Sequence, residues 1–123
     1  MNNEKPQDIR ERCLAYAVRA IRLYQELEKH KDGAARVIGK QFLRSATSIG
    51  ANLEEAQSAE SRADFIHKYG IAQKESKESL YWLRLMGESG IVPKERLSAM
   101  ARETEELYAV ITAIIVNAKA KLR

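Results

Sequence analysis

The sequence has few residues that interrupt a helix, and this scarcity sets the first expectation. Its 123 residues include only two prolines, Pro6 and Pro93, and six glycines. Because proline cannot continue a helix and glycine weakens one, such a chain favours long helices. No segment alternates polar and apolar residues with the period of two that marks a strand. The sequence therefore predicts an all-α protein.

Cysteine and long apolar runs are also scarce. The single cysteine, Cys13, excludes an intrachain disulfide, and a free thiol suits a reducing compartment. Cys13 falls in a helical apolar pattern, so we interpret it as a small buried side chain. No run approaches the ~20 apolar residues that span a bilayer, and residues 1–6 offer no apolar stretch for a signal peptide. We expect a cytoplasmic protein with no membrane partner.

The composition is that of one soluble globular domain. Hydrophobic residues make up 45% of the chain and charged residues 31%, which is far from the composition of a disordered protein. A chain of this length buries enough surface for one core. The net charge of +4 permits nucleic acid as a partner without requiring it. We expect a single domain over residues 1–123.

Four helical segments are indicated by apolar residues that recur at alternating steps of three and four, the spacing of a bundle seam. Pro6 and Pro93 suit first helical positions, and Ser61 suits an N-cap. Gly33 and Gly90 suit the ends of the first and third segments. Similar lengths and short connections favour an antiparallel up-down-up-down four-helix bundle. The predicted helices cover about 6–30, 34–58, 62–88 and 93–122.

The first and fourth segments carry more apolar residues than one core needs. These segments are neighbours in an up-down bundle, so their surplus faces are expected to form one contiguous patch, which would mark a partner surface. The alternative is that the seam is merely wide. The predicted seam of the fourth segment contains Ile111, Ile114 and Ala118, which leaves Ile115 outside it. The residues expected at an interface between copies are Leu14, Val18, Ile21, Tyr24, Tyr108 and Ile115.

A stripe of polar residues shares one face of the second segment, again at steps of four and three. Two interpretations stay open. The stripe is either an exposed polar face or a buried or interfacial hydrogen-bond network that fixes the helix register. Its members are Gln41, Ser45, Ser48, Asn52 and Glu55.

Basic residues that share helical faces make nucleic acid a candidate ligand. Arg36, Lys40 and Arg44 are spaced four apart and form one stripe. A ring of copies would multiply such a stripe, and phosphate binding depends on summed charge. The alternative is a solvated face with local ion pairs. The candidate nucleic-acid-binding residues are Arg12, Arg19, Arg22, Arg36, Lys40, Arg44, Lys119 and Lys121.

The sequence contains no pattern typical of a catalytic or metal centre. Phosphate-binding glycine loops, nucleophile elbows and paired Cys-His motifs are absent. A di-iron bundle site needs two Glu-x-x-His motifs, whereas this sequence has one related pair, Asp64 and His67. Glu75 and Glu78 are expected to pair with Lys74, Lys77 or Arg44. We expect no metal, no cofactor and no enzymatic activity.

Two runs of the sequence resemble the four-helix-bundle proteins encoded in 23S rRNA intervening sequences. The first covers 41–56 and includes an arginine–serine pair at 44–45, a serine–isoleucine pair at 48–49 and Asn52. The second covers 64–78 and continues through 81–86. The resemblance extends over about 9–118, most of the chain.

The resemblance carries expectations about assembly and partners. It implies a bacterial origin, an up-down bundle, a homopentameric ring and structural roles for Arg44, Ser45, Ser48 and Asn52. The same fold family includes the accessory variability proteins of diversity-generating retroelements, a branch that binds nucleic acid and a reverse transcriptase through a basic surface. This sequence looks closer to the intervening-sequence branch. RNA or DNA, and a protein such as a reverse transcriptase, are candidate partners.

These observations favour a non-catalytic oligomeric module that contacts nucleic acid. The competing interpretation is a structural or protein-interaction scaffold without affinity for nucleic acid. A metal-binding enzyme of the ferritin type is the third class, and the sequence supports it least.

Overall fold

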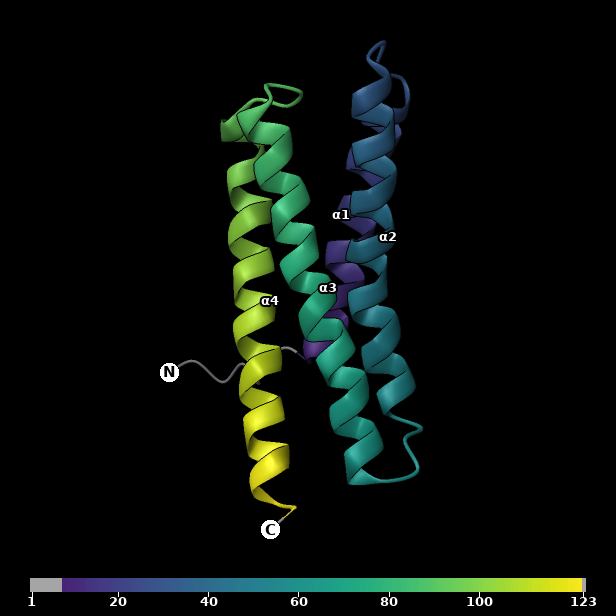
Figure 1. The fold of residues 1–123 in the computed structure, drawn as a ribbon, viewed down its shortest axis with the longest axis vertical. Helices are drawn as coiled ribbons and strands as arrows, with labels where there is room; N and C mark the ends of the chain where they lie inside the picture. Colours follow the sequence, from purple (N-terminus) through teal and green to yellow (C-terminus); the bar gives the residue numbers. More distant parts are fainter. Residues whose placement is uncertain (1–7, 123) are drawn as a thin grey trace, which may run out of the picture.

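Four α-helices form almost all of the chain that the structure describes. The computed structural model describes residues 8–122, and within them it contains four helices and no strand. The prediction of an all-α, four-helix protein is confirmed. The helices, drawn in Figure 1, are α1 (Ile9–Glu28), α2 (Gly33–Ala56), α3 (Arg62–Glu88) and α4 (Lys94–Ala120).

Helix starts follow the local capping chemistry. The Asp8 carboxylate accepts a hydrogen bond from the Arg10 N–H and caps α1, while the predicted start at Pro6 lies outside the described residues. The Ser61 hydroxyl accepts from the Asp64 N–H at 3.0 Å, which confirms Ser61 as the N-cap of α3. Pro93 precedes the first residue of α4.

The two glycines expected at helix ends behave differently. Gly90 follows α3 with a φ of +78°, a conformation that favours glycine, and this prediction is confirmed. Gly33 instead begins α2, because the Asp32 carboxylate accepts from the Ala34 N–H at 2.9 Å and caps that helix. The prediction that Gly33 ends the first helix is wrong, and α1 already stops at Glu28.

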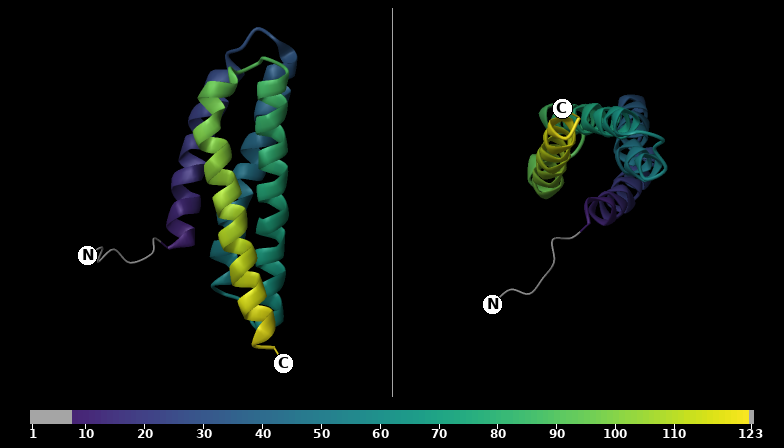
Figure 2. Two further views of the ribbon diagram at one scale, coloured as in Figure 1. Left: turned by 90° about the vertical axis from the view of Figure 1, so that its left-hand side faces the viewer. Right: turned by 90° about the horizontal axis from the view of Figure 1, so that it is seen from below.

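Consecutive helices run in opposite directions, and the α1–α2 and α3–α4 loops lie at the same end of the molecule (Figure 1). Helix α2 packs along both α1 and α3, and α3 packs along α4. The fourth side is far less closed, since α1 and α4 have few residues in contact. In the end view of Figure 2, the four helices form an incomplete ring that is open between α1 and α4.

One apolar core runs along the bundle, and the predicted seams supply most of it. Phe42, Ile49 and Leu53 of α2 are completely buried, and Cys13 is buried as expected. The seam of α4 departs from the prediction near its end: Ile115 is only 7% exposed and belongs to the core, whereas Ile114 packs at its edge. The prediction that Ile115 lies outside the seam is wrong.

A layer of four hydroxyl groups, one from each helix, crosses the middle of the core. The Tyr16 hydroxyl bonds to Thr104 Oγ1 at 2.7 Å, and Ser45 Oγ bonds to Ser79 Oγ at 2.8 Å. Burial raises the pKa of Tyr16 to about 12, opposed in part by hydrogen bonding to Thr104 and Ser79. Because buried hydroxyls without partners are costly, the layer favours the helix register in which all four are paired.

Two glycines of α2 allow α1 to approach closely. A Cβ atom added at Gly39 would lie 3.0 Å from the Leu27 Cβ, and one added at Gly50 would lie 3.1 Å from the Cys13 Cβ. Helix α3 offers a contrast, because a Cβ added at Gly70 would have no neighbour within 4 Å. The first two glycines therefore serve close packing, whereas Gly70 only lowers helix propensity.

Substitution of these glycines is expected to change stability in opposite directions. Gly39→Leu forces its side chain against Leu27 and should lower the free energy of unfolding by about 1–3 kcal/mol. Gly70→Ala should raise it by roughly 0.5–1 kcal/mol, because alanine is the better helix former and the site is open. Urea denaturation of both variants measures the two changes. Equal destabilisation by both would contradict this account of α1–α2 packing.

None of the helices in residues 8–122 combines the length and the apolar character that crossing a membrane requires.

Candidate nucleic-acid interface

Arg12 is one of the predicted phosphate ligands, and the structure gives it an internal role. Its guanidinium lies 2.6 Å from the Glu103 carboxylate and 3.0 Å from that of Glu106. Both acids belong to α4, so Arg12 ties α1 to α4 across the open side of the bundle. The hydrogen bond to Glu103 is the largest of the effects that raise the pKa of Arg12. Its charge is therefore largely neutralised by neighbouring acids.

Arg44 is similarly engaged with two acids of α3. Its guanidinium pairs with Glu78 and lies 3.4 Å from a Glu75 oxygen. The Trp82 indole N–H donates to the same Glu78 carboxylate at 2.9 Å. The hydrogen bond from Trp82, followed by that from Arg44, lowers the pKa of Glu78. Of the partners expected for Glu75 and Glu78, Arg44 is the one with which they pair, and this removes Arg44 from the free cations.

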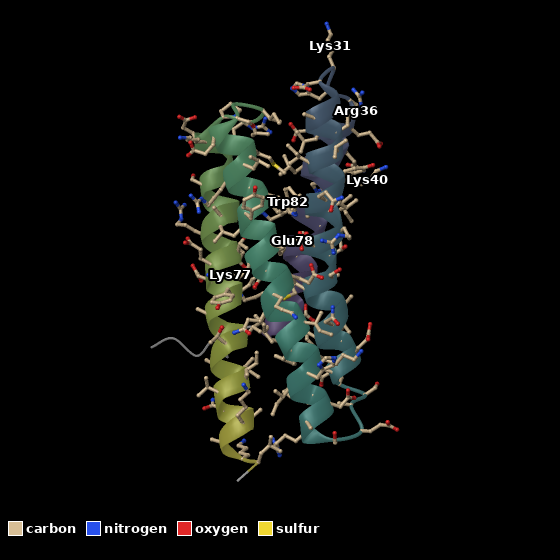
Figure 3. The ribbon with its side chains drawn as sticks, viewed as in Figure 1. Lys31, Arg36, Lys40, Lys77, Glu78 and Trp82 are labelled. Atoms are coloured by element: carbon tan, nitrogen blue, oxygen red, sulfur yellow. The ribbon has the colours of Figure 1, made fainter. Side chains whose placement is uncertain are left out.

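The end of the bundle that carries the α1–α2 loop gathers exposed positive charge, and Figure 3 labels Lys31, Arg36 and Lys40 there. Arg36 Nη1 donates to the His30 carbonyl at 2.6 Å and to the Lys31 carbonyl at 3.3 Å. These bonds fix the guanidinium at the C-terminal end of α1 without neutralising its charge. We define the end cluster as Lys29, Lys31, Arg36 and Lys40.

None of the four side chains in the end cluster forms a salt bridge within residues 8–122. The acids at this end have other partners. Asp32 caps α2, Glu28 accepts from the Tyr24 hydroxyl, and Glu26 pairs with Arg96 at 2.8 Å. The end cluster is therefore available to an external anion.

Arg19 and Arg22 lie on α1 and are farther from the α1–α2 loop than Lys29 of the end cluster is. Both are exposed, and they border a hollow between α1 and α4 whose wall also includes Arg96 and the apolar Leu97 and Met100. Their charge is thus close to the open side of the bundle rather than on the α2 stripe.

The remaining predicted cations are remote from the end cluster. Lys119 and Lys121 lie at the C-terminal end of α4, at the opposite end of the molecule from the α1–α2 loop (Figure 1). Lys119 occupies the last turn of α4, where a cation complements the helix dipole. The eight candidate residues thus do not form a single surface.

Sequence reasoning missed three exposed cations of α3, namely Lys74, Lys77 and Arg84. The spacing that places them on one face was readable in the sequence, but Lys74 and Lys77 were among the partners expected for Glu75 and Glu78. The pairing of those acids with Arg44 of another helix increases the excess of positive charge on this face.

The residues expected at an oligomer interface separate into two groups. Leu14, Val18 and Ile21 are 64%, 41% and 42% exposed, and their spacing places them on one side of α1. We call these three residues the α1 outer row. Tyr24 is half-buried on the same helix, with its hydroxyl bound to Glu28.

The two interface candidates of α4 do not join that row. Tyr108 is half-buried and faces α3, where the Lys77 ammonium lies 4.6 Å from its ring centroid. Ile115 belongs to the core. The prediction of one contiguous α1–α4 patch is wrong, because α1 and α4 contact each other little and these side chains point elsewhere.

The polar stripe of α2 contains buried, half-buried and exposed residues. Ser45 is buried in the hydroxyl layer, so the network interpretation holds for that residue. Ser48 and Asn52 are half-buried and bond to carbonyls one turn earlier in their own helix, at 2.7 and 2.8 Å. Gln41 and Glu55 are exposed, and Glu55 pairs with Lys68 at 2.8 Å.

Metal-ligating side chains are not clustered in the described part of the chain. Within residues 8–122, no group of three or more His, Cys, Asp or Glu side chains is placed to hold a metal ion.

The sequence matches the family described as 23S rRNA-intervening sequence protein over residues 5–113. The fold is similar to a crystal structure from Bacteroides thetaiotaomicron, described as a protein with unknown function from the S23 ribosomal protein family. The two chains are 39% identical with a TM-score of 0.82, over 88% of this chain and 98% of that one. No curated protein matches the sequence.

Proposed function

Because the chain belongs to the family of 23S rRNA-intervening sequence proteins, we propose that it is a non-catalytic oligomeric module that binds nucleic acid. The observation that carries this proposal is the end cluster, four exposed cations that have no carboxylate partner within residues 8–122. Phosphate groups are the natural counter-charge for such a cluster.

Assembly strengthens the argument from charge. The α1 outer row exposes three large apolar side chains on one helix face, and such a face suits contact with a copy of the chain. In a ring with rotational symmetry, the same end of every subunit lies on the same side. The end clusters of all subunits would then add up on one rim. The pentamer implied by the family resemblance is the stoichiometry we expect.

Salt-dependent binding tests the proposal. We expect the oligomer to bind a generic single-stranded RNA at about 50 mM salt and to lose affinity steeply as salt rises. The doubly substituted variant Lys31→Gln, Lys40→Gln should bind more weakly. In a plot of the logarithm of the binding constant against the logarithm of salt concentration, the slope of this variant should be shallower by roughly 0.7 for each phosphate that it no longer neutralises. Fluorescence anisotropy of labelled RNA measures both quantities.

The control removes one charge at the other end of the molecule. Lys121→Gln should leave both the affinity and the salt slope close to those of the unmodified protein, because Lys121 lies far from the end cluster. Absence of binding by the unmodified protein at low salt would reject the proposal and favour a protein-interaction scaffold.

A further inference from the structure

The outward face of α3 carries three cations with a tyrosine among them. Lys74, Lys77, Tyr81 and Arg84 follow one another at steps of three, four and three, so they share one side of the helix. All four are exposed, and Tyr81 is 56% exposed. Figure 3 labels Lys77 on this helix, close to Glu78 and Trp82. We call these four residues the α3 row.

The acids near the α3 row are largely committed to other cations. Glu75 and Glu78 pair with Arg44 of α2, and Glu88 pairs with Lys94 at 3.1 Å. No cation of the α3 row forms a salt bridge within residues 8–122. Glu105 of α4 lines the same hollow as Lys77 and offsets part of its charge, and the Lys77 ammonium also lies over the Tyr108 ring of α4, a contact that leaves the charge in place. The row therefore has net positive charge.

The tyrosine of the row is supported by an anchored neighbour. The Trp82 indole is held by its 2.9 Å hydrogen bond to Glu78, which in turn pairs with Arg44. The Tyr81 ring meets the Trp82 ring edge-on, with centroids 5.2 Å apart and planes inclined by 68°. This contact restricts the Tyr81 ring while more than half of its surface stays open to solvent.

An exposed aromatic ring between cations matches the chemistry of an unpaired nucleic-acid strand. Bases of such a strand stack on aromatic side chains, and its phosphates are held by lysine and arginine. A duplex offers the phosphates but keeps its bases stacked on one another, so it cannot use the ring. The combination of ring and charge therefore selects a single strand over a duplex.

We propose that the α3 row binds single-stranded RNA, with Tyr81 stacked on a base and Lys74, Lys77 and Arg84 against phosphates. The inference rests on the proposed function and adds the ligand class and a second contact surface, distinct from the end cluster. The row spans about 15 Å from Lys74 to Arg84 at 1.5 Å per residue.

The experiment compares Tyr81→Ala with Tyr81→Phe in the full-length protein, using labelled oligouridine RNA of about twelve nucleotides as the probe. Tyr81→Ala should weaken binding by about fivefold to 100-fold and leave the salt slope unchanged, because stacking carries no charge. Tyr81→Phe retains a stacking ring and should bind like the unmodified protein. Double-stranded RNA should be insensitive to both changes.

Two further measurements test the geometry. Trp82 is the only tryptophan in the sequence, so its emission should change when RNA binds next to Tyr81. Glu105→Gln removes the carboxylate beside Lys77 and should strengthen RNA binding, whereas Lys77→Gln should weaken it and reduce the salt slope.

The outcomes separate this inference from the proposed function. Weaker binding by Tyr81→Ala together with normal binding by Tyr81→Phe supports the α3 row. If Lys31→Gln, Lys40→Gln weakens binding but neither Tyr81 variant does, the α3 row is refuted and the proposed function stands. If the unmodified protein binds no RNA, both fall. Circular dichroism confirms that each variant remains helical.

Discussion

Raising the pH from about 8 to about 11 should lower the free energy of unfolding by several kcal/mol, through two buried side chains of α1. Cys13 and Tyr16 are 0% and 1% exposed. Burial is the main cause that raises both pKa values, from 9.0 to about 12 for the Cys13 thiol and from 10.0 to about 12 for the Tyr16 hydroxyl. Both groups thus stay protonated in the folded protein at a pH where the unfolded chain has lost those protons.

The sign of the effect follows from this difference in bound protons. Above about pH 9 for Cys13 and pH 10 for Tyr16, the unfolded chain binds fewer protons than the folded one, so rising pH favours unfolding. Each group contributes a slope of up to about 1.4 kcal/mol per pH unit. The loss continues until the pH reaches the folded-state pKa of about 12. Well below pH 9 both groups are protonated in the folded and the unfolded chain, so neither makes stability depend on pH.

Urea denaturation at a series of pH values measures the slope. The comparison variant is Cys13→Ala, Tyr16→Phe, which removes both protons and is expected to be less stable at neutral pH. Its stability should nevertheless fall less steeply between pH 9 and 11, and the remaining slope includes Tyr69, whose pKa burial also raises. An unchanged slope in the double variant would contradict the role assigned to these two groups.

The sequence predicted the helices and most of the core because both depend on local periodicity. The steps of three and four placed Phe42, Ile49 and Leu53 correctly in the seam of α2. The same rule failed late in α4, where Ile115 and not Ile114 is buried. A straight helix drifts by about 20° per heptad relative to a strict seven-residue repeat. Over the 27 residues of α4 this drift exchanges neighbouring positions.

The candidate interface was less predictable because it depends on partners that are distant in the sequence. Arg12 was counted as a phosphate ligand, but its partner Glu103 lies 91 residues away on another helix. Conversely, Glu75 and Glu78 offset most of the charge of the α3 row in the sequence, and only the fold shows that Arg44 pairs with both of these acids. A sequence gives the charges of each helix, but only the packing of helices shows which charges neutralise each other.

Replacing Ile21 by aspartate is expected to disrupt assembly, whereas replacing Ile115 by aspartate is expected to destabilise the fold. Ile21 belongs to the α1 outer row and is 42% exposed, so a carboxylate there remains hydrated within one subunit. Ile21→Asp should keep its helicity and dissociate the proposed oligomer, because the charge would be buried only at the contact between copies. Ile115 is 7% exposed, so Ile115→Asp buries a carboxylate in the core and should cost more than about 3 kcal/mol of stability.

Sedimentation and denaturation together separate these outcomes, and Val37→Asp is the matched control. Val37 is 62% exposed on α2, a helix that contributes no residue to the α1 outer row, so the same added charge should alter neither mass nor stability. If Ile21→Asp keeps the mass of the unmodified oligomer, the α1 outer row is not the contact between copies. If the unmodified protein sediments as a monomer at micromolar concentration, there is no ring to add the end clusters together. RNA binding would then have to rest on the cations of one subunit alone.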